Sequence, residues 1–259
     1  MMKCQDTVKK SVSALAVVNN YINLNILIIN ASGRTGSAIV KELSGSESNL
    51  ILTSGSSDSI DGLDAIRWRY QGEDSVESLF NDVKSKHDEI HAVVNCLGSI
   101  FLKPAHLTKK EDFDSVLDLN LRSSFFILKN SIPLMRKNGG SLLFFSSAAA
   151  NIGLSNHEAI AAAKGGLEGL VKSAAATYAK NNIRVNALAL GLVESNLSEG
   201  IVSNPAALEV SKKMHSIGKI GSPENIAKFA TPLILDSSSW ITGSIINIDG
   251  GLSTTKLVS

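Results

Sequence analysis

One lysine stands in a run of small and apolar residues late in the chain. The stretch from residue 156 reads NHEAIAAAKGGLEGL, and Lys164 lies between its alanines and glycines. Ile160 comes four residues earlier, so a helix would place both side chains on one face. Small neighbours permit close packing, which favours a lysine directed into a cleft over the alternative, a solvated helix lysine.

Other polar residues near this lysine have the chemistry to move protons. Histidine is a common general acid in proteins, so His157 could serve as one, although a surface position at the helix entry is the interpretation that the sequence favours. Glu158 is interpreted as a first-turn carboxylate stabilised by the helix dipole. Ser147 follows an apolar run, so its hydroxyl either belongs to a site or satisfies backbone groups at a turn.

Short apolar runs alternate along the chain with longer segments of helical periodicity. Most of the runs are apolar on both faces, which suits strands that are covered on both sides. Such alternation predicts a doubly wound parallel sheet with right-handed crossovers. The expected strands are 25–30, 49–54, 65–70, 90–95, 141–146, 183–188 and 244–249, and the expected helices are 36–44, 74–86, 111–137, 157–180 and 223–235.

Composition limits the partners. The chain has 259 residues, 44% of them hydrophobic, and a net charge of +1 without long basic runs, which suits one globular domain that binds a small molecule or another protein. Nucleic acid and membrane surfaces are not expected partners. No stretch approaches the ~18–20 apolar residues of a membrane span. Cys4 and Cys96 cannot form a disulfide framework, so we expect a reducing, cytoplasmic location.

The first 23 residues precede the expected domain, which covers 24–259. Lysines are followed there by SALAVV, which is short for the apolar region of a signal peptide, and no cleavage site follows. We therefore interpret this segment as a poorly ordered extension.

A glycine-bearing turn, NASGRTGSAIV (30–40), opens the first expected helix. Backbone N–H groups and the positive helix end at such a turn attract a phosphate. With only Gly33 and Gly36, an ordinary tight turn is the alternative, so the rest of the chain must supply the context.

Seven motifs in order resemble the short-chain dehydrogenase/reductase family over about residues 24–252. This resemblance implies an α/β, single-domain Rossmann fold with a doubly wound seven-stranded parallel sheet, a nicotinamide dinucleotide cofactor, and assembly into homodimers or homotetramers. The motifs are NASGRTG for the family's T-G-x-x-x-G-x-G, NCLG (95–98), NLRSSF (120–125), SSAAA (146–150), the Lys164 stretch for Tyr-x-x-x-Lys, RVNALALGLVES (184–195) and residues 221–251.

In that family a tyrosine phenol gives a proton to the carbonyl oxygen as hydride arrives from the nicotinamide, and the lysine lowers the phenol's pKa and holds the ribose. The resemblance places Ile160 at the tyrosine position, thirteen residues after Ser147 as in the family. Tyr178 would lie ~27 Å further along the helix axis at 1.5 Å per residue. Tyr21 belongs to the extension, and Tyr70 is expected on the adenosine side. The expected catalytic residues are Ser147, Lys164, Asn120 and His157.

The resemblance also implies a cofactor site. No carboxylate follows the second expected strand, where LTSGSS offers serines, so a 2′-phosphate would not be repelled. With Arg34 in the glycine turn, NADP(H) is favoured and NAD(H) is possible, although Arg34 also fits a surface role. No metal site is expected. The expected cofactor-binding residues are Asn30, Ser32, Gly33, Arg34, Thr35, Gly36, Asn95, Gly98, Lys164 and Gly191.

Two classes of function follow from these residues. The retained Asn120, Ser147 and Lys164 favour an oxidoreductase acting on a small carbonyl or alcohol with an unusual proton donor. The isoleucine at position 160 favours a catalytically impaired dinucleotide-binding or scaffold protein. Residues 194–215 are expected to form a mobile lid over the substrate.

Overall fold

A computed structural model describes residues 24–235 and 240–256, so the expected N-terminal extension lies outside the described residues. They form an eight-stranded sheet of order β3-β4-β2-β1-β5-β6-β7-β8. All seven expected strands are present and pair in parallel, and the two-residue β3 adds an antiparallel edge. The strands are β1 (Asn25–Ile29), β2 (Asn49–Ser54), β3 (Ser59–Ile60), β4 (Leu63–Arg67), β5 (Ala92–Asn95), β6 (Gly140–Ser147), β7 (Ile183–Leu190) and β8 (Ile245–Ile248).

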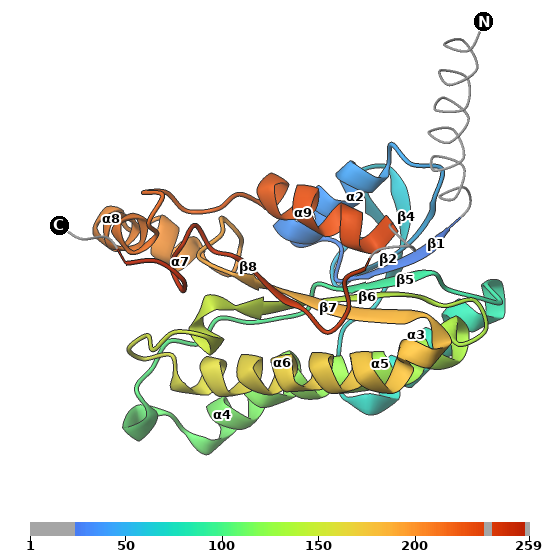
Figure 1. Ribbon diagram of the computed structural model, residues 1–259, viewed down its shortest axis with the longest axis horizontal. Coiled ribbons are helices and arrows are strands. Elements are labelled where there is room, and N and C mark those ends of the chain that lie inside the picture. The colour runs from blue at the N-terminus through green and yellow to red at the C-terminus, as the bar shows by residue number, and fades with distance from the viewer. Residues whose placement is uncertain (1–23, 236–239, 257–259) are drawn as a thin grey trace, which may run out of the picture.

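Helices cover both faces of this sheet (Figure 1). One apolar cluster packs α2 and α9 on one face, and a second packs α3, α5 and α6 on the other, which explains why the central strands are apolar throughout. Beyond one end of the strands lie α7 and α8. The helices are α2 (Arg34–Leu43), α3 (Glu73–Lys86), α4 (Lys110–Leu117), α5 (Ser123–Met135), α6 (Glu158–Tyr178), α7 (Glu199–Val202), α8 (Pro205–Met214) and α9 (Pro223–Leu235).

Two expected elements differ from the observed ones. The strand expected over 65–70 ends at Arg67, because its neighbour β2 ends at Ser54 and the Trp68 N–H makes the last backbone contact, to the Ser54 carbonyl at 2.8 Å. The single helix expected over 111–137 is divided into α4, a π-helical segment (Asp118–Arg122) and α5. Helical periodicity alone does not reveal such a segment, which differs from its neighbours only in its hydrogen-bond spacing.

The carboxyl ends of the parallel strands meet at one edge of the sheet. The chain reverses its direction of winding between β1 and β5, which is where ligands bind in doubly wound sheets. The glycine turn (30–36), NCLG (95–98) and SSAAA (146–150) each lie at the carboxyl end of one of these strands. None of the helices within the described ranges is long and apolar enough to cross a membrane.

Candidate active site

The turn after β1 brings backbone close to backbone. Asn30 has a φ of 58°, a left-handed conformation that asparagine tolerates, where the family has glycine. A Cβ on Gly36 would lie 2.8 Å from Ala31 Cα, so only glycine lets α2 begin so near the strand. The turn and the first turn of α2 line a cavity of about 270 Å³, which suits a phosphate group. The expected residues at this cavity are Asn30, Ser32, Gly33, Arg34, Thr35, Gly36 and Gly98.

A second cavity, of about 370 Å³, adjoins the first and shares Asn30, Ser32 and Ser56 with it. Arg69 lines this cavity and donates a hydrogen bond of 2.8 Å from Nε to the Gly55 carbonyl. Arg34 lines the first cavity and donates from Nε to Asn196 Oδ1 at 3.1 Å. Sequence reasoning identified Arg34 and missed Arg69, although the arginine-rich RWRYQG stretch signals positive charge after β4.

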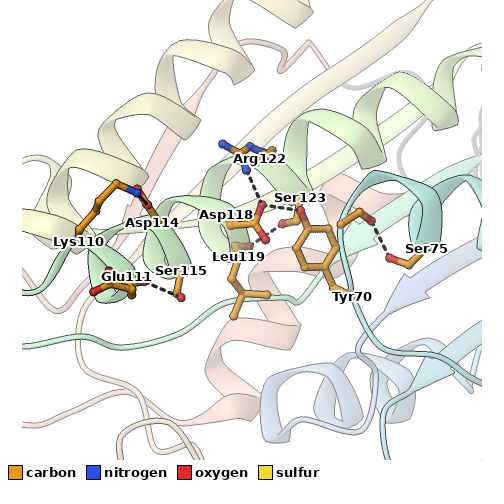
Figure 2. A network of polar contacts seen from close by, with 11 residues as sticks. Tyr70, Ser75, Lys110, Glu111, Asp114, Ser115, Asp118, Leu119, Arg122 and Ser123 are labelled. Carbon is orange, nitrogen blue, oxygen red and sulfur yellow. Dashed lines mark hydrogen bonds and ion pairs between the residues drawn. The ribbon is translucent and has the colours of Figure 1, made fainter.

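Tyr70 also lines the second cavity. Figure 2 shows its hydroxyl directed at Asp118, to which it donates a 3.1 Å hydrogen bond, while Arg122 contacts the same carboxylate oxygen at 3.1 Å. Partial burial and the Asp118 charge raise the pKa of Tyr70 to about 12. The phenol therefore stays protonated. Its hydrogen bond to Asp118 links the segment after β4 to the π-helical segment.

That π-helical segment carries Asn120, which is buried. Asn120 Nδ2 donates to Ser99 Oγ at 2.9 Å and to the Val116 carbonyl at 3.0 Å, and Oδ1 accepts the Ser99 N–H at 3.1 Å. A Cβ on Gly98 would lie 3.4 Å from Asn120 Oδ1 and 3.7 Å from Lys164 Nζ. Asn120 therefore holds the loop after β5 in place beside the lysine.

Lys164 is only 7% exposed and projects from α6 toward β6. Its Nζ donates a 2.8 Å hydrogen bond to the Phe145 carbonyl, which leaves two N–H donors unused by any contact with the described residues. Burial lowers the pKa of the ammonium to about 8. The cavity that it lines, of about 180 Å³, shares Thr35, Cys96, Gly98, Ser195 and Leu197 with the phosphate cavity.

Ser147 and Ile160 line the Lys164 cavity as well. The Ser147 hydroxyl accepts the Ala149 N–H at 3.2 Å, so its own proton is free for a ligand oxygen. Ile160 is buried and places a hydrocarbon wall one turn from Lys164. Neither Tyr70 nor Tyr178, the tyrosines among the described residues, lines this cavity. Tyr178 ends α6 and packs against the hydrophobic core.

His157 does not line the cavity that contains Lys164. It lines a larger cavity, of about 650 Å³. Its Nδ1 donates to the Ser155 carbonyl at 2.8 Å, which leaves Nε2 free. Glu158 begins α6 and is exposed, in agreement with its interpretation as a first-turn carboxylate.

Two of the expected cofactor residues support the backbone. Asn95 is buried, donates to Ser124 Oγ at 3.1 Å, accepts the Leu97 N–H at 3.1 Å, and lines none of these cavities. Gly191 lines the small and large cavities, and a Cβ there would lie 2.6 Å from His215 Nε2. Sequence reasoning missed His215, which no motif marks.

The four cavities form one groove along the carboxyl edge of the sheet, because each shares residues with the next. A glycine turn at a helix N-terminus, followed by a buried lysine and a hydroxyl, defines a dinucleotide-binding α/β protein. Within the described part of the chain, no group of three or more His, Cys, Asp or Glu side chains is placed to hold a metal ion.

Comparisons with known proteins identify the family. A family model described as "Enoyl-(Acyl carrier protein) reductase" matches residues 59–253. A chloroplastic tropinone reductase homolog of Arabidopsis thaliana is 32% identical over 68% of this chain and 56% of its own length. The 3-oxoacyl-[acyl-carrier-protein] reductase of Thermotoga maritima is 34% identical over 69% of this chain and 72% of its own length.

A solved structure gives the same result. Ligand-free aldohexose dehydrogenase of Thermoplasma acidophilum superposes with a TM-score of 0.84 at 25% identity, over 92% of this chain and 97% of that one. The chain belongs to the short-chain dehydrogenase/reductase family, whose members are NAD(P)-dependent oxidoreductases. It spans just over half the length of the Arabidopsis relative and nearly three quarters of the Thermotoga enzyme.

Proposed function

We propose that this protein interconverts a small carbonyl compound and its alcohol with a nicotinamide dinucleotide, and that the proton comes from a group other than tyrosine. One observation carries the proposal: Lys164, Ser147 and Ile160 line a single small cavity. The proposal takes Ile160 to occupy the position of the family's tyrosine, as the spacing of four residues before Lys164 suggests. Binding and orienting groups are thus present, and only the usual acid is replaced.

Each residue has a distinct task in this reaction. The bound cofactor supplies or accepts hydride. Ser147 donates its free hydroxyl proton in a hydrogen bond to the carbonyl oxygen, which polarises the carbonyl. The Lys164 ammonium holds the ribose and, with a pKa near 8, delivers a proton through water, because an acid of that pKa is partly dissociated near neutral pH. His157 is the second candidate donor: because Nδ1 already donates to the Ser155 carbonyl, Nε2 can give a proton only from the doubly protonated ring.

The groove fits such a cofactor. The close approach at Gly36 leaves the first N–H groups of α2 open to a pyrophosphate, and Gly98 leaves room between the β5 loop and Lys164. Arg34 and Arg69 line the two adjoining cavities that share Ser56, on the side where the ribose 2′-group is expected. This positive pair supports NADP(H) as the preferred cofactor, with NAD(H) as the possible alternative.

We further propose a homodimer or homotetramer in the cytoplasm. Phe113 on α4 and Phe125 on α5 are solvent-exposed, and a Cβ on Gly165 or Gly169 of α6 would meet nothing within 4 Å, so this helix layer presents an open apolar surface. Gly166, next to Gly165 in the same helix, instead packs inward against Leu121. Sparse cysteine content supports the location. Light scattering at micromolar concentration tests the assembly, and a monomer mass would overturn it.

A catalytically impaired dinucleotide-binding protein is the second candidate, and Ile160 favours it, because general acid catalysis contributes about a hundred- to ten-thousandfold. One experiment separates the two. NADPH and NADH are titrated against the wild type and Ile160→Tyr by nicotinamide fluorescence, and reduction of 2-decanone is then measured with the bound cofactor.

We expect slow turnover in the wild type and an increase of at least tenfold in Ile160→Tyr, which restores a phenol one turn from Lys164. Cofactor binding without turnover in either protein would favour the binding role. No binding of either nucleotide would overturn both candidates.

A further inference from the structure

At the end of the groove formed by α7 and α8 lies the largest of its four cavities, of about 650 Å³. This volume lies within the ~300–1,000 Å³ range of pockets that enclose whole ligands. α8 and α7 line one side of it, and the loop after β5 lines another. It is continuous with the Lys164 cavity, so a molecule filling it would present one end to Ser147. Both cavities are lined by Ile100, Ser147, Ile160, Leu190, Gly191 and Leu192.

No charged side chain lines this cavity. Of the described residues that form its wall, none is an aspartate, glutamate, lysine or arginine. His215 is buried, and its ring is satisfied internally, because Nε2 accepts the Leu192 N–H at 3.1 Å and Nδ1 donates to the Ser211 carbonyl at 2.7 Å. Away from His157, a charged ligand group would lose its hydration here without gaining a counter-ion.

Large apolar side chains face this cavity while remaining open to solvent. Ile100 and Leu102 are 40% and 42% exposed on the loop after β5, and Val210 and Met214 are 59% and 43% exposed on α8. The two pairs belong to segments more than one hundred residues apart in the chain, yet they line one cavity. Exposed apolar groups gathered at a concave site mark a surface that a ligand covers.

We propose that the substrate is an uncharged carbonyl compound, or its alcohol, with an extended apolar body that occupies this cavity. The inference rests on the proposed function for the position of the reacting oxygen, which lies at Ser147. It excludes carboxylates and phosphates near the body because of their desolvation cost, and sugars because the scattered polar groups of the wall would leave sugar hydroxyls against apolar side chains without hydrogen-bond partners. Those polar groups are the side chains of Ser147, Asn156, His157, Ser211 and His215.

Matched pairs of ligands test the class without requiring turnover. Hexanamide, octanamide and decanamide are neutral, and hexanoate, octanoate and decanoate are charged analogues of equal length. Titration calorimetry of the full chain with saturating NADPH should show amide affinity rising roughly tenfold for every two methylenes, because each buried methylene favours binding. Each carboxylate should bind at least tenfold more weakly than its amide. Equal or tighter carboxylate binding, or no dependence on length, would overturn the inference.

A variant localises the effect. Val210→Asp places a carboxylate on the wall at a solvent-exposed position that a folded chain tolerates, and decanamide binding should weaken at least tenfold. Leu63→Asp makes the same change at a partly exposed leucine of β4 outside the cavity and should leave binding unchanged. Equal decanamide affinity in both variants and the wild type would show that the ligand binds outside this cavity and would contradict the inference.

The failure of the proposed function gives a different result. If the amides bind as expected but 2-decanone is not reduced by the wild type or by Ile160→Tyr, the result supports the apolar ligand pocket and contradicts the proposed redox function. If 4-oxopentanoate, a charged ketone, is reduced faster than 2-decanone, the result supports the proposed enzymatic function and contradicts the inference that the substrate is uncharged.

Discussion

The ammonium group of Lys164 donates a 2.8 Å hydrogen bond to the carbonyl of Phe145, two residues before Ser147. This contact ties the N-terminal part of α6 to the end of β6 and holds the ammonium beside the cavity that Lys164 lines. The lysine and the serine therefore line one cavity together with Ile160, which lies one helical turn before the lysine.

Cofactor affinity should depend on the protonation of Lys164. Burial lowers its pKa to about 8, so the ammonium is charged below that pH and becomes neutral as the pH rises through it. We expect NADPH to bind most tightly at pH 6.5–7 and progressively more weakly toward pH 9.5. Lys164→Met should weaken binding at pH 7 by about an order of magnitude, since a charge-assisted hydrogen bond is worth ~1.5–3 kcal/mol, and should flatten the pH profile.

Lys172→Met is the matched control, because Lys172 lies on the same helix but is exposed. Fluorescence titrations across pH provide the measurement. A wild-type affinity that stays constant from pH 6.5 to 9.5 would contradict this role for the ammonium.

Preference for NADPH over NADH should depend on two arginines. Arg34→Ala and Arg69→Ala should each reduce the ratio of the two affinities, and the double variant should reduce it most, since both guanidinium groups line cavities that share Ser56. Arg136→Ala, at the end of α5, is a control for net charge alone. Tighter binding of NADH by the wild type would show that the preference is reversed.

The Tyr70–Asp118 contact should be visible in solution. Because burial and Asp118 raise the pKa of Tyr70 to about 12, absorbance at 295 nm should show one tyrosine that ionises well above the ordinary value of about 10. Tyr70→Phe should remove that late transition and lower the free energy of unfolding by about 1–2 kcal/mol. Tyr178→Phe serves as the control, and persistence of the late transition in Tyr70→Phe would assign it to another residue.

The close approach of His215 to Gly191 should leave no room for a side chain at position 191. Gly191→Ala places a Cβ 2.6 Å from His215 Nε2 and 3.0 Å from Asp249 Cα, so His215 must move and release the Leu192 N–H. We expect a loss of about 1–3 kcal/mol in unfolding free energy from overpacking, together with weaker decanamide binding. Gly200→Ala on α7, where an added Cβ meets nothing within 4 Å, is the matched control. Denaturant unfolding of both variants compares them.

Local patterns in the sequence were enough to determine the architecture. Apolar runs alternating with helical periodicity predicted all seven parallel strands, and the spacing of Ile160 and Lys164 placed them on one face of α6. Such features depend on residues close together in the chain.

Only the tertiary structure decided how those residues are grouped. Pairing of β4 with β2 brings Arg69 to Gly55, and packing of β5 against α5 turns Asn95 inward to Ser124. His157 faces the large cavity instead of Lys164. The absence of charge from that cavity's described wall emerges only when segments more than one hundred residues apart fold together, because a cavity is a product of long-range packing and no local periodicity encodes it.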